Sequence, residues 1–397
     1  MRIGMVLDRE FPPDDRVEKE ARSLIKAGFE VHLLCFTFGR LPVFEEYKGI
    51  KVHRVFMPRA FFKKLSALIL TVPFYRRFWQ KRMKTFVAEN EIDVLHIHDL
   101  PLVGVGLEIK KQFNIPLIAD MHENYPVFIS EIKFANTLAG RLLISKKKWF
   151  KKEREWLSAA DRIIVVNEGM QERIEQQGVQ GKTFVVVPNS PEIKQVLNSQ
   201  EDLPELEAKY RDKFVLFYFG GLDSRRGLDV LIETIAVLRK QISNLNIVIV
   251  GNGSYRSVLE EQIKALNVES YVSFEEWHPV AHLQAFLKWA NVGVIPHLKS
   301  PQTDNSSPNK LFLYMLFKIP IVASNCRSIQ AVVEEDKCGL IFTSGNSAEL
   351  ARHILYLYNH PEDSQAMGAH GFKAVTQKYD WSVGADRMIK MYKEIST

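Results

Sequence analysis

The stretch Thr303–Ser324 reads T-D-N-S-S-P-N-K-L-F-L-Y-M-L-F-K-I-P-I-V-A-S and indicates how the chain folds. Asp304–Pro308 is a polar loop, Lys310–Phe317 an apolar run of helical length, and Ile319–Ala323 a candidate buried strand. A polar loop leading into a helix is suited to bind anions, because free backbone N–H groups and the positive end of the helix dipole point the same way. The plain alternative is an α–β unit without a ligand, and the rest of the chain has to distinguish the two.

Size and composition indicate a soluble globular protein with two domains. The chain has 397 residues, of which 46% are hydrophobic and 25% charged. Met1–Leu7 enters a strand pattern directly, so we expect no secretory signal, and the longest apolar run, Leu65–Phe74, is too short to span a bilayer. The three cysteines have neither metal-site nor disulfide-framework spacing. We therefore expect a cytoplasmic protein.

The first half of the chain alternates strands with helices. Arg2–Leu7 reads as a strand, Asp15–Ala27 as a helix and Glu30–Phe36 as the next strand. Further strands are expected at residues 51–56, 93–98, 116–120, 162–166 and 183–187, with a helix at 101–113. This alternation predicts a doubly wound parallel sheet, in which ligands bind outside the carboxyl ends of the strands.

Three loops at those strand ends carry residues capable of chemistry. They are Asp8–Arg16, His96-Ile97-His98-Asp99 and Asp120-Met121-His122-Glu123-Asn124. Neighbouring strand ends converge on one cleft, and these residues are therefore candidates for a functional site. The alternative interpretation is that the histidines only support the scaffold. A metal site is a further alternative, but the spacings do not match metalloenzyme motifs, and we predict no metal.

The positive charge of the chain is concentrated in its first half. Residues 1–190 carry a net charge of about +8 and the remainder about −2. Arg59–Phe86 and Lys146–Trp156 carry most of it and mix lysine and arginine with aromatic and aliphatic side chains. Such segments bind anionic bilayers, with Trp and Phe entering the interface; core helices with solvated basic faces are the alternative. We expect an anionic membrane surface as a partner, and no nucleic acid, because no binding module is recognisable.

The alternation restarts after a polar stretch, Asn189–Lys213, which reads as a linker. Strands are expected at residues 214–219, 246–250, 271–274 and 292–295, with helices at 228–240, 254–266 and 279–289. We therefore predict an N-terminal domain of residues 1–190, a C-terminal domain of residues 191–378 and a final helical segment of residues 379–397. The two similar domains are expected to face a cleft.

Two glycine-containing loops of the second half follow predicted strands. Gly220–Gly227 combines glycines that allow close approach of a ligand with Arg225 and Arg226 just before a helix. Guanidinium groups match the geometry of phosphate oxygens. Gly251-Asn252-Gly253 is a second close-approach turn. Together with the loop before Lys310, three strand ends would surround one diphosphate.

With these motifs in this order, the chain resembles the retaining nucleotide-sugar glycosyltransferases of family four, the glycosyl transferases group 1. The matching motifs are D-D-R-V-E-K-E-A-R-S-L-I-K-A-G-F-E-V (14–31), H-I-H-D-L-P (96–101), A-D-M-H-E-N-Y-P (119–126), F-G-G-L-D-S-R-R-G-L-D-V-L-I-E (219–233), V-G-N-G (250–253) and S-P-N-K-L-F-L-Y-M-L-F-K-I-P-I-V-A-S (307–324). Tyr379-Asp380-Trp381 is similar to the segment that crosses back to the N-terminal domain.

The resemblance implies the GT-B fold, an α/β fold with two Rossmann-like, doubly wound parallel-sheet domains. It implies transfer of a sugar from a UDP- or GDP-sugar, with retention of configuration, to a lipid-linked (polyprenyl-linked) or cell-surface glycan acceptor. The setting would be cell-envelope polysaccharide synthesis, in the cytoplasm or peripherally at the inner face of the plasma membrane. No metal or other cofactor is expected, because cationic side chains and a helix N-terminus can stabilise the leaving group.

The resemblance also assigns roles to residues. His122 would lie near the sugar and the attacking hydroxyl, with Glu123 as the second catalytic candidate. Arg16, His98 and Asp99 would lie on the acceptor side. The predicted donor-binding residues are Gly221, Arg225, Arg226, Gly251, Asn252, Gly253, Asn305, Ser306, Ser307 and Lys310.

Two positions depart from the family pattern. Gly221 stands where an arginine is usual, which makes Arg225 its candidate substitute. Asn305 and Leu313 stand where the family has an E-x7-E pair, whose second glutamate accepts hydrogen bonds from the ribose hydroxyls. Leucine has no acceptor, and loss of a charged one would weaken donor binding by about 1.5–3 kcal/mol. A non-catalytic GT-B protein that binds nucleotide, glycan or a partner is therefore the second hypothesis, and a nucleotide-sugar epimerase is a distant third.

Overall fold

The computed structural model describes residues 1–58, 68–131, 133–198, 203–276 and 280–395. The chain forms two compact units, which we call the N-terminal unit (Met1–Pro188 with Gly384–Thr397) and the C-terminal unit (Asn189–Val383). The sequence-based boundaries after residues 190 and 378 thus differ from these by two and five residues.

The N-terminal unit contains an eight-stranded sheet of order β3-β4-β2-β1-β5-β6-β7-β8. Its strands are β1 (Arg2–Glu10), β2 (Glu30–Thr37), β3 (Phe44–Tyr47), β4 (Ile50–Phe56), β5 (Val94–His98), β6 (Leu117–Met121), β7 (Arg162–Val165) and β8 (Thr183–Val186). The predicted strands are confirmed to within a few residues. The sheet also contains β3, which the sequence did not predict. It pairs antiparallel with β4 through a hairpin whose turn residues, Lys48 and Gly49, have φ values of 51° and 83°.

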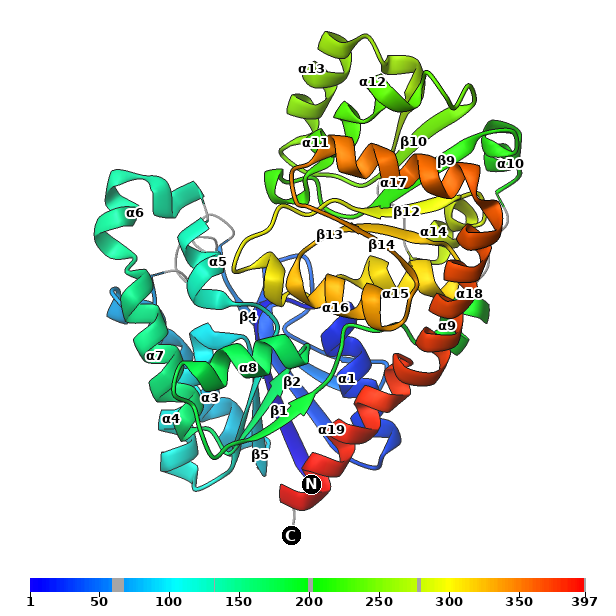
Figure 1. The fold of residues 1–397 in the computed structure, drawn as a ribbon. Helices are drawn as coiled ribbons and strands as arrows, with labels where there is room; N and C mark the ends of the chain where they lie inside the picture. The colour runs from blue at the N-terminus through cyan, green and yellow to red at the C-terminus, as the bar shows by residue number, and fades with distance from the viewer. Residues whose placement is uncertain (59–67, 132, 199–202, 277–279, 396–397) are drawn as a thin grey trace. The chain divides into compact units, whose positions relative to one another are not determined.

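Helices connect these strands (Figure 1). They are α1 (Asp15–Lys26), α3 (Pro73–Glu89), α4 (Leu100–Phe113), α5 (Tyr125–Glu131), the 3-10 helix η1 (Lys133–Asn136), α6 (Leu138–Leu143), α7 (Lys146–Ala159), α8 (Glu168–Gln176) and the final helix α19 (Trp381–Ile395). Asp14 caps α1, since its side chain accepts a hydrogen bond from the Val17 N–H at 3.2 Å. No helix in the described ranges is long and apolar enough to cross a bilayer.

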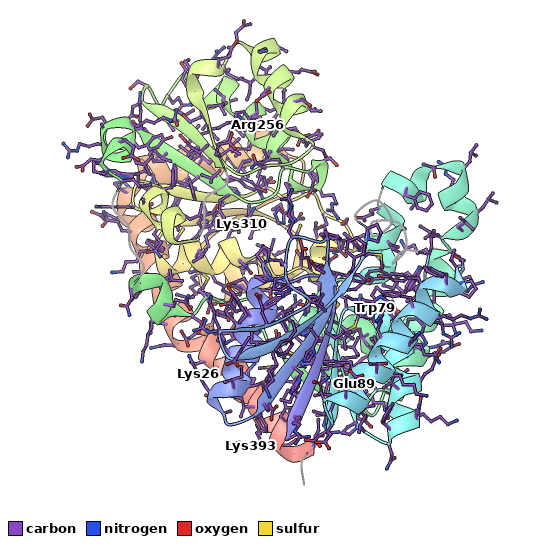
Figure 2. The ribbon with its side chains drawn as sticks, turned by 180° about the vertical axis from the view of Figure 1, so that it is seen from behind. Lys26, Trp79, Glu89, Arg256, Lys310 and Lys393 are labelled. Atoms are coloured by element: carbon purple, nitrogen blue, oxygen red, sulfur yellow. The ribbon has the colours of Figure 1, made fainter. Side chains whose placement is uncertain are left out.

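Tryptophans of the two basic segments belong to the hydrophobic core. Trp79 on α3 (labelled in Figure 2) is fully buried, and its ring lies 4.8 Å from that of Phe36 on β2. Trp149 on α7 is 1% exposed. The prediction that tryptophans of these segments enter a bilayer is therefore wrong for both residues. Residues 59–67 of the first basic segment lie outside the described part of the chain.

The C-terminal unit contains a six-stranded parallel sheet of order β11-β10-β9-β12-β13-β14. Its strands are β9 (Phe214–Phe219), β10 (Leu245–Val250), β11 (Val272–Glu275), β12 (Val292–Ile295), β13 (Ile321–Ser324) and β14 (Gly339–Phe342). Its helices are α9 (Ile193–Asn198), α10 (Pro204–Tyr210), η2 (Ser224–Arg226), α11 (Leu228–Glu233), α12 (Ile235–Leu238), α13 (Arg256–Leu266), η3 (Glu269–Tyr271), α14 (Val280–Leu287), η4 (Thr303–Asn305), α15 (Asn309–Leu316), α16 (Arg327–Glu335), α17 (Ser347–Asn359) and α18 (Pro361–Lys378).

Both faces of this sheet are buried, as the continuous apolar strands predict. Along β9, Val215, Phe217 and Phe219 belong to one hydrophobic cluster, whereas Leu216 and Tyr218 belong to another. Alternation along a strand points successive side chains to opposite faces, so helices must cover both.

The stretch 303–324 has the predicted order of loop, helix and strand. A 3-10 turn (η4) precedes α15, and β13 begins at Ile321, two residues later than predicted. Pro320 lies immediately before β13 and has no backbone N–H to contribute to a strand ladder. The predicted donor residues lie at the carboxyl ends of β9, β10 and β12 and at the start of α15.

Close packing of β12 against α15 generates a stability prediction. A Cβ atom at Gly293 would lie 2.4 Å from the ring of Tyr314, which is fully buried and donates a hydrogen bond from its hydroxyl to the Phe217 carbonyl at 3.0 Å. We expect Gly293→Ala to lower the free energy of unfolding by about 1–3 kcal/mol, because the anchored ring cannot move aside. Thermal and urea denaturation measure this. Gly221→Ala is the control, since no atom lies within 4 Å of its Cβ position; equal losses in the two variants would contradict the packing argument.

Candidate functional site

The N-terminal unit contains a buried polar cluster centred on Asp120 at the end of β6, in which His122 is partly exposed. Asp120 Oδ2 accepts a hydrogen bond from His122 Nε2 at 2.8 Å and lies 3.2 Å from His98 Nδ1 and 3.3 Å from His96 Nε2. His96 and His98 come from the neighbouring strand β5. The two predicted loops therefore converge, and the structure brings His98 and His122 together as expected.

Helix α1 supplies the buried side chains of Arg16 and Glu20 to this cluster, and burial and the Asp120 carboxylate raise the pKa of Glu20 to about 8. Arg16 donates from Nη2 to Asp120 Oδ1 at 3.2 Å and from Nη1 to the Val187 carbonyl at 2.8 Å, and its Nε lies 2.9 Å from Glu20 Oε1. The sequence did not single out Glu20. A signal was present, because Arg16 and Glu20 are four residues apart on the stripe of α1 that also carries the apolar Val17.

The final helix also reaches the cluster. Tyr392 of α19 is fully buried, and its hydroxyl lies 2.6 Å from His96 Nδ1. That contact occupies the second ring nitrogen of His96 and orients the ring. Sequence reasoning missed Tyr392, since nothing in the local pattern of α19 distinguishes it from an ordinary core aromatic residue.

The three histidines of the cluster differ in charge at neutral pH. Burial lowers the pKa of His122, but the Asp120 and Asp99 carboxylates outweigh burial and raise it to about 9. Burial and the neighbouring His96 lower the pKa of His98 to about 3, and burial also lowers that of His96. His122 is therefore a cation held by Asp120, whereas the other two rings are neutral.

Asp99, the residue after β5, has an unusual backbone conformation. Its φ of 63° and ψ of 156° lie in a region that residues with a Cβ atom rarely adopt. Its N–H donates to the Asp120 carbonyl at 2.8 Å, and Oδ2 accepts from Arg9 Nη2 at 3.3 Å. Arg9 Nη2 also lies 3.7 Å from Glu123 Oε1, which places the second catalytic candidate beside the acceptor-side residues. Arg9 itself was part of a predicted loop but was not predicted as a site residue.

Four side chains of the cluster could in principle ligate a metal ion. They are Glu20, His96, His98 and Asp120, and one potential ligand atom from each lies within 4.8 Å of those of the other three. The charges do not fit an ion, because the Arg16 guanidinium contacts both carboxylates and the His122 cation contacts one of them. A divalent ion would be repelled by both cations. That the protein uses no metal stays a prediction.

In the C-terminal unit, the loop after β9 is organised by Asp223. Its Oδ1 accepts from the Arg225 N–H at 3.1 Å and from Arg225 Nε at 3.0 Å, and its Oδ2 accepts from Arg226 Nε at 3.2 Å. Asp223 also caps η2, and Gly227 follows with a φ of 62°. One carboxylate therefore holds both predicted phosphate-binding arginines.

Lys310, on the first turn of α15, lies beside this loop. Its side chain is 6% exposed, and its Nζ lies 3.5 Å from the centre of the Tyr218 ring and 3.1 Å from where a Cβ at Gly220 would be (Figure 2). Among the ion pairs that the described residues form, none involves Lys310. Burial and nearby Arg226 lower the pKa of Lys310 well below its usual value. A buried cation facing other cations is costly unless an anion binds there.

His297, just after β12, completes this group and was not predicted. It is fully buried, and its Nε2 lies 3.3 Å from Arg226 Nη1, so the neutral ring accepts a hydrogen bond from the guanidinium. Burial and the cations Lys310 and Arg226 hold the pKa of His297 well below its usual value. Its position two residues beyond the predicted strand 292–295, near a strand end as for His98, was the available signal.

The predicted glycine turn after β10 packs against the loop after β9. A Cβ atom at Gly251 would lie 2.0 Å from the Gly220 carbonyl oxygen, and one at Gly253 would lie 2.0 Å from that of Leu222. The Asn252 carbonyl accepts a hydrogen bond from the Leu222 N–H at 3.0 Å. Glycine is therefore required at positions 251 and 253 by close contact between two backbones. No such contact accounts for Gly221, because no atom lies within 4 Å of a Cβ placed there.

The remaining predicted donor residues lie in the loop before α15. Asn305 Nδ2 donates to the Pro301 carbonyl at 2.8 Å, Ser306 Oγ donates to the Thr303 carbonyl at 2.9 Å, and the Ser307 carbonyl accepts from Asn189 Nδ2 at 3.4 Å. These contacts shape the loop. Leu313, on α15, is buried in the same hydrophobic cluster as Phe219 and provides no acceptor.

Comparison with known protein families matches both halves of the chain. The family model described as glycosyl transferases group 1 matches residues 199–374, and that described as Glycosyltransferase Family 4 matches residues 16–192. The first lies within the C-terminal unit, and the second covers most of the N-terminal unit and ends four residues beyond Pro188.

Several characterised proteins are similar over most of their length. A phosphatidyl-myo-inositol mannosyltransferase of Mycobacterium leprae is 23% identical over 319 residues, which cover 80% of this chain and 77% of that protein. An alpha-monoglucosyldiacylglycerol synthase of Acholeplasma laidlawii is 22% identical over 382 residues, covering 91% and 89%.

Solved structures establish the fold. Sucrose-phosphate synthase from Thermosynechococcus elongatus superposes with a TM-score of 0.81 at 18% identity, over 100% of this chain and 99% of the other. Anabaena HepE in complex with UDP-glucose gives 0.72 at 16% identity, over 99% and 100%. The predicted GT-B fold, with two parallel-sheet α/β domains, is confirmed.

The charge of His122 is directly measurable. We expect its imidazole to stay protonated through pH 8 while His96 and His98 are neutral, because Asp120 and Asp99 raise its pKa to about 9. Nitrogen-15 NMR of the histidine rings measures this, with His122→Asn to assign the resonance. Since its pKa is raised on folding, the stabilisation from His122 is fully present below about pH 6.5 and is lost as the pH rises through about 9. A neutral His122 ring at pH 7 would contradict the assignment.

We expect Lys310 to lower the stability of the unliganded protein and to be required for anion binding. We expect Lys310→Met to raise the free energy of unfolding of the unliganded protein by about 1 kcal/mol or more, because it removes a buried cation without a carboxylate partner. It should also abolish the thermal stabilisation that pyrophosphate gives the unsubstituted protein. Lys318→Met is the control, since Lys318 is an exposed lysine stacked on Phe372, 4.9 Å from the ring centre. Destabilisation by Lys310→Met, with pyrophosphate binding intact, would show that Lys310 is structural.

Proposed function

Because the chain belongs to the glycosyl transferases group 1 family, we propose that it transfers a hexose-type sugar from a UDP- or GDP-sugar to a lipid-linked or cell-surface glycan acceptor. The transfer proceeds with retention of configuration and serves cell-envelope polysaccharide synthesis. The observation that carries the proposal is the buried Lys310 beside Arg226, a cationic site in the unit matched by the group 1 model. The names of the mycobacterial and Acholeplasma relatives, which act on lipids, support a lipid-linked acceptor.

The cationic site of the C-terminal unit suits a nucleotide diphosphate. Arg225 and Arg226 bring two positive charges and Asp223 brings one negative charge, and Lys310, whose pKa is lowered by burial and Arg226, adds a third positive charge when an anion binds beside it. The excess of two positive charges complements a diphosphate, and the N-terminal end of α15 adds free backbone N–H groups. When the bond from sugar to diphosphate breaks, negative charge develops on the leaving group, and these fixed cations stabilise it without a metal ion.

The buried cluster of the N-terminal unit suits hydroxyl groups. His122 is protonated, so it donates hydrogen bonds and cannot accept the proton of the attacking hydroxyl at neutral pH. Asp99 Oδ1 and His98 Nε2 are buried atoms that make no hydrogen bond to any described residue. An acceptor or sugar hydroxyl that bonds to them would satisfy polar atoms that are otherwise costly to bury.

Leu313 favours a second candidate function, a GT-B protein that binds nucleotide or glycan without catalysis. Its side chain is part of the hydrophobic core, so α15 offers no hydrogen-bond acceptor for ribose at that position. The phosphate-binding half of the site is independent of this residue. The two candidates therefore agree on nucleotide binding and differ in turnover.

A panel of nucleotide sugars distinguishes the two. We expect UDP or GDP to raise the melting temperature, and one corresponding nucleotide sugar to be consumed in the presence of polyprenyl-phosphate or glycolipid acceptors. NMR of the product should show the anomeric configuration of the donor. Arg226→Ala should abolish both effects, and Lys318→Met should leave them unchanged.

The possible results separate the hypotheses. Stabilisation by nucleotide without turnover of any donor would favour the non-catalytic candidate. A product of inverted configuration would refute retention, and an absence of any nucleotide effect on folded protein would refute both candidates.

A further inference from the structure

Helix α6 exposes leucines that the N-terminal unit does not bury. Leu138 is 83% exposed, Leu142 is 87% exposed and Leu143 is 39% exposed. Leu138 and Leu142 are four residues apart and so lie on one face of the helix. In Figure 1, α6 lies at the outer end of the layer formed by α5, α6 and α7, away from the strands of the sheet. Scattered single apolar residues are normal on a surface, but two nearly fully exposed leucines on one helical face form a patch.

The patch leads directly into basic residues. No aspartate or glutamate occurs between Leu138 and Lys152, and the segment contains Arg141 and five lysines. A hollow of about 560 Å³ at the start of α7 is lined by Lys147, Lys148, Lys151 and Arg154 together with uncharged residues. The first acidic residue that follows, Glu153, is buried and bonded to Arg173 through both carboxylate oxygens.

Basic residues of α3 extend the same surface. A second hollow, of about 270 Å³, is lined by Arg76 of α3 with Lys148 and Lys152 of α7, and also by Glu108 of α4, which forms an ion pair with Arg76. Lys148 Nζ also donates a hydrogen bond to the Leu70 carbonyl at 2.9 Å, which ties α7 to the segment before α3. Phe74, on the first turn of α3, is 66% exposed. Basic charge and exposed apolar side chains therefore occur together on this part of the unit.

We propose that α6 and the first two turns of α7 form a docking surface for a bilayer containing anionic phospholipids. Leu138, Leu142 and Leu143 enter the boundary between headgroups and acyl chains, and the lysines of α7 contact lipid phosphates. Charge complementarity selects this occupant, because residues 138–152 combine an apolar helical face with six basic residues and no acid. Glu155, the exposed acid of α7 nearest to them, pairs with Lys151 and Lys152 and leaves Arg141, Lys146 and Lys147 for lipid phosphates. The leucines take the role that the sequence pattern assigned to tryptophan and phenylalanine side chains, of which Trp79 and Trp149 are buried.

This surface deepens the proposed function, since a lipid-linked acceptor is reached at a membrane. Its test is independent of sugar transfer. The full-length protein is sedimented with vesicles of neutral phosphatidylcholine alone, or with about one third phosphatidylglycerol. We expect binding to the anionic vesicles and not to the neutral ones, with loss at high salt.

Two double variants separate the apolar and electrostatic parts. Leu138→Ser/Leu142→Ser and Lys147→Gln/Lys151→Gln should each weaken vesicle binding about tenfold or more, without a change in melting temperature, because these side chains are exposed. The control is Lys194→Gln/Leu197→Ser on α9, which removes one exposed lysine and one exposed leucine elsewhere. The control should bind vesicles like the unsubstituted protein.

Other results would overturn the proposal. Undiminished binding by both α6 and α7 variants would place the docking surface elsewhere, and equal binding to neutral vesicles would refute the electrostatic part. Absence of vesicle binding, together with self-association that Leu138→Ser/Leu142→Ser abolishes, would assign the leucines to a second copy of the chain. None of these results depends on donor binding, so failure here leaves the proposed sugar transfer to be judged separately.

Discussion

The Asp120 carboxylate is the interaction on which the N-terminal unit depends. It lies at the end of β6 and contacts Arg16 of α1, His96 and His98 of β5, and His122 in the loop that follows. Through His96 it is also connected to the final helix. A fully buried carboxylate is stable as an anion only where cations and N–H donors surround it, and these neighbours hold the pKa of Asp120 well below its usual value despite burial. The same requirement positions His122 and keeps it charged.

The two units differ in whether their buried charges are balanced by other charges of the protein. In the N-terminal unit, Arg16 and the His122 cation balance the carboxylates within the protein itself. In the C-terminal unit, Asp223 faces three cations, and no ion pair of the described residues involves Lys310. A balanced cluster is suited to orient neutral hydroxyl groups, and an unbalanced one is suited to bind an anion. This difference in charge balance supports the proposal that one unit binds the acceptor and the other the donor.

The basic segments show why composition alone misassigns a surface. Aromatic residues interleaved with lysines suit both a membrane interface and a helix that packs on a sheet. Trp79 and Trp149 contribute to the core because their helices cover the sheet, whereas Phe74 at the start of α3 and the leucines of the short helix α6 are exposed. Which side of a helix faces the core is decided by the elements packed against it, and these are distant in sequence.

The sequence by itself determined the order of strands and helices, the two-domain GT-B fold, and the strand ends at which His98, His122, Arg226 and Lys310 lie. The order of elements and the strand ends follow from local periodicity and turn residues, which need only neighbouring positions, whereas the GT-B fold was implied by the resemblance of motifs along the whole chain to a known family. The tertiary structure decided the contacts of Glu20, Tyr392 and His297, the protonation of His122, and the exposure of α6. Each depends on burial and on charges contributed by other elements, because a pKa or an exposed face is a property of the surroundings and not of the residue.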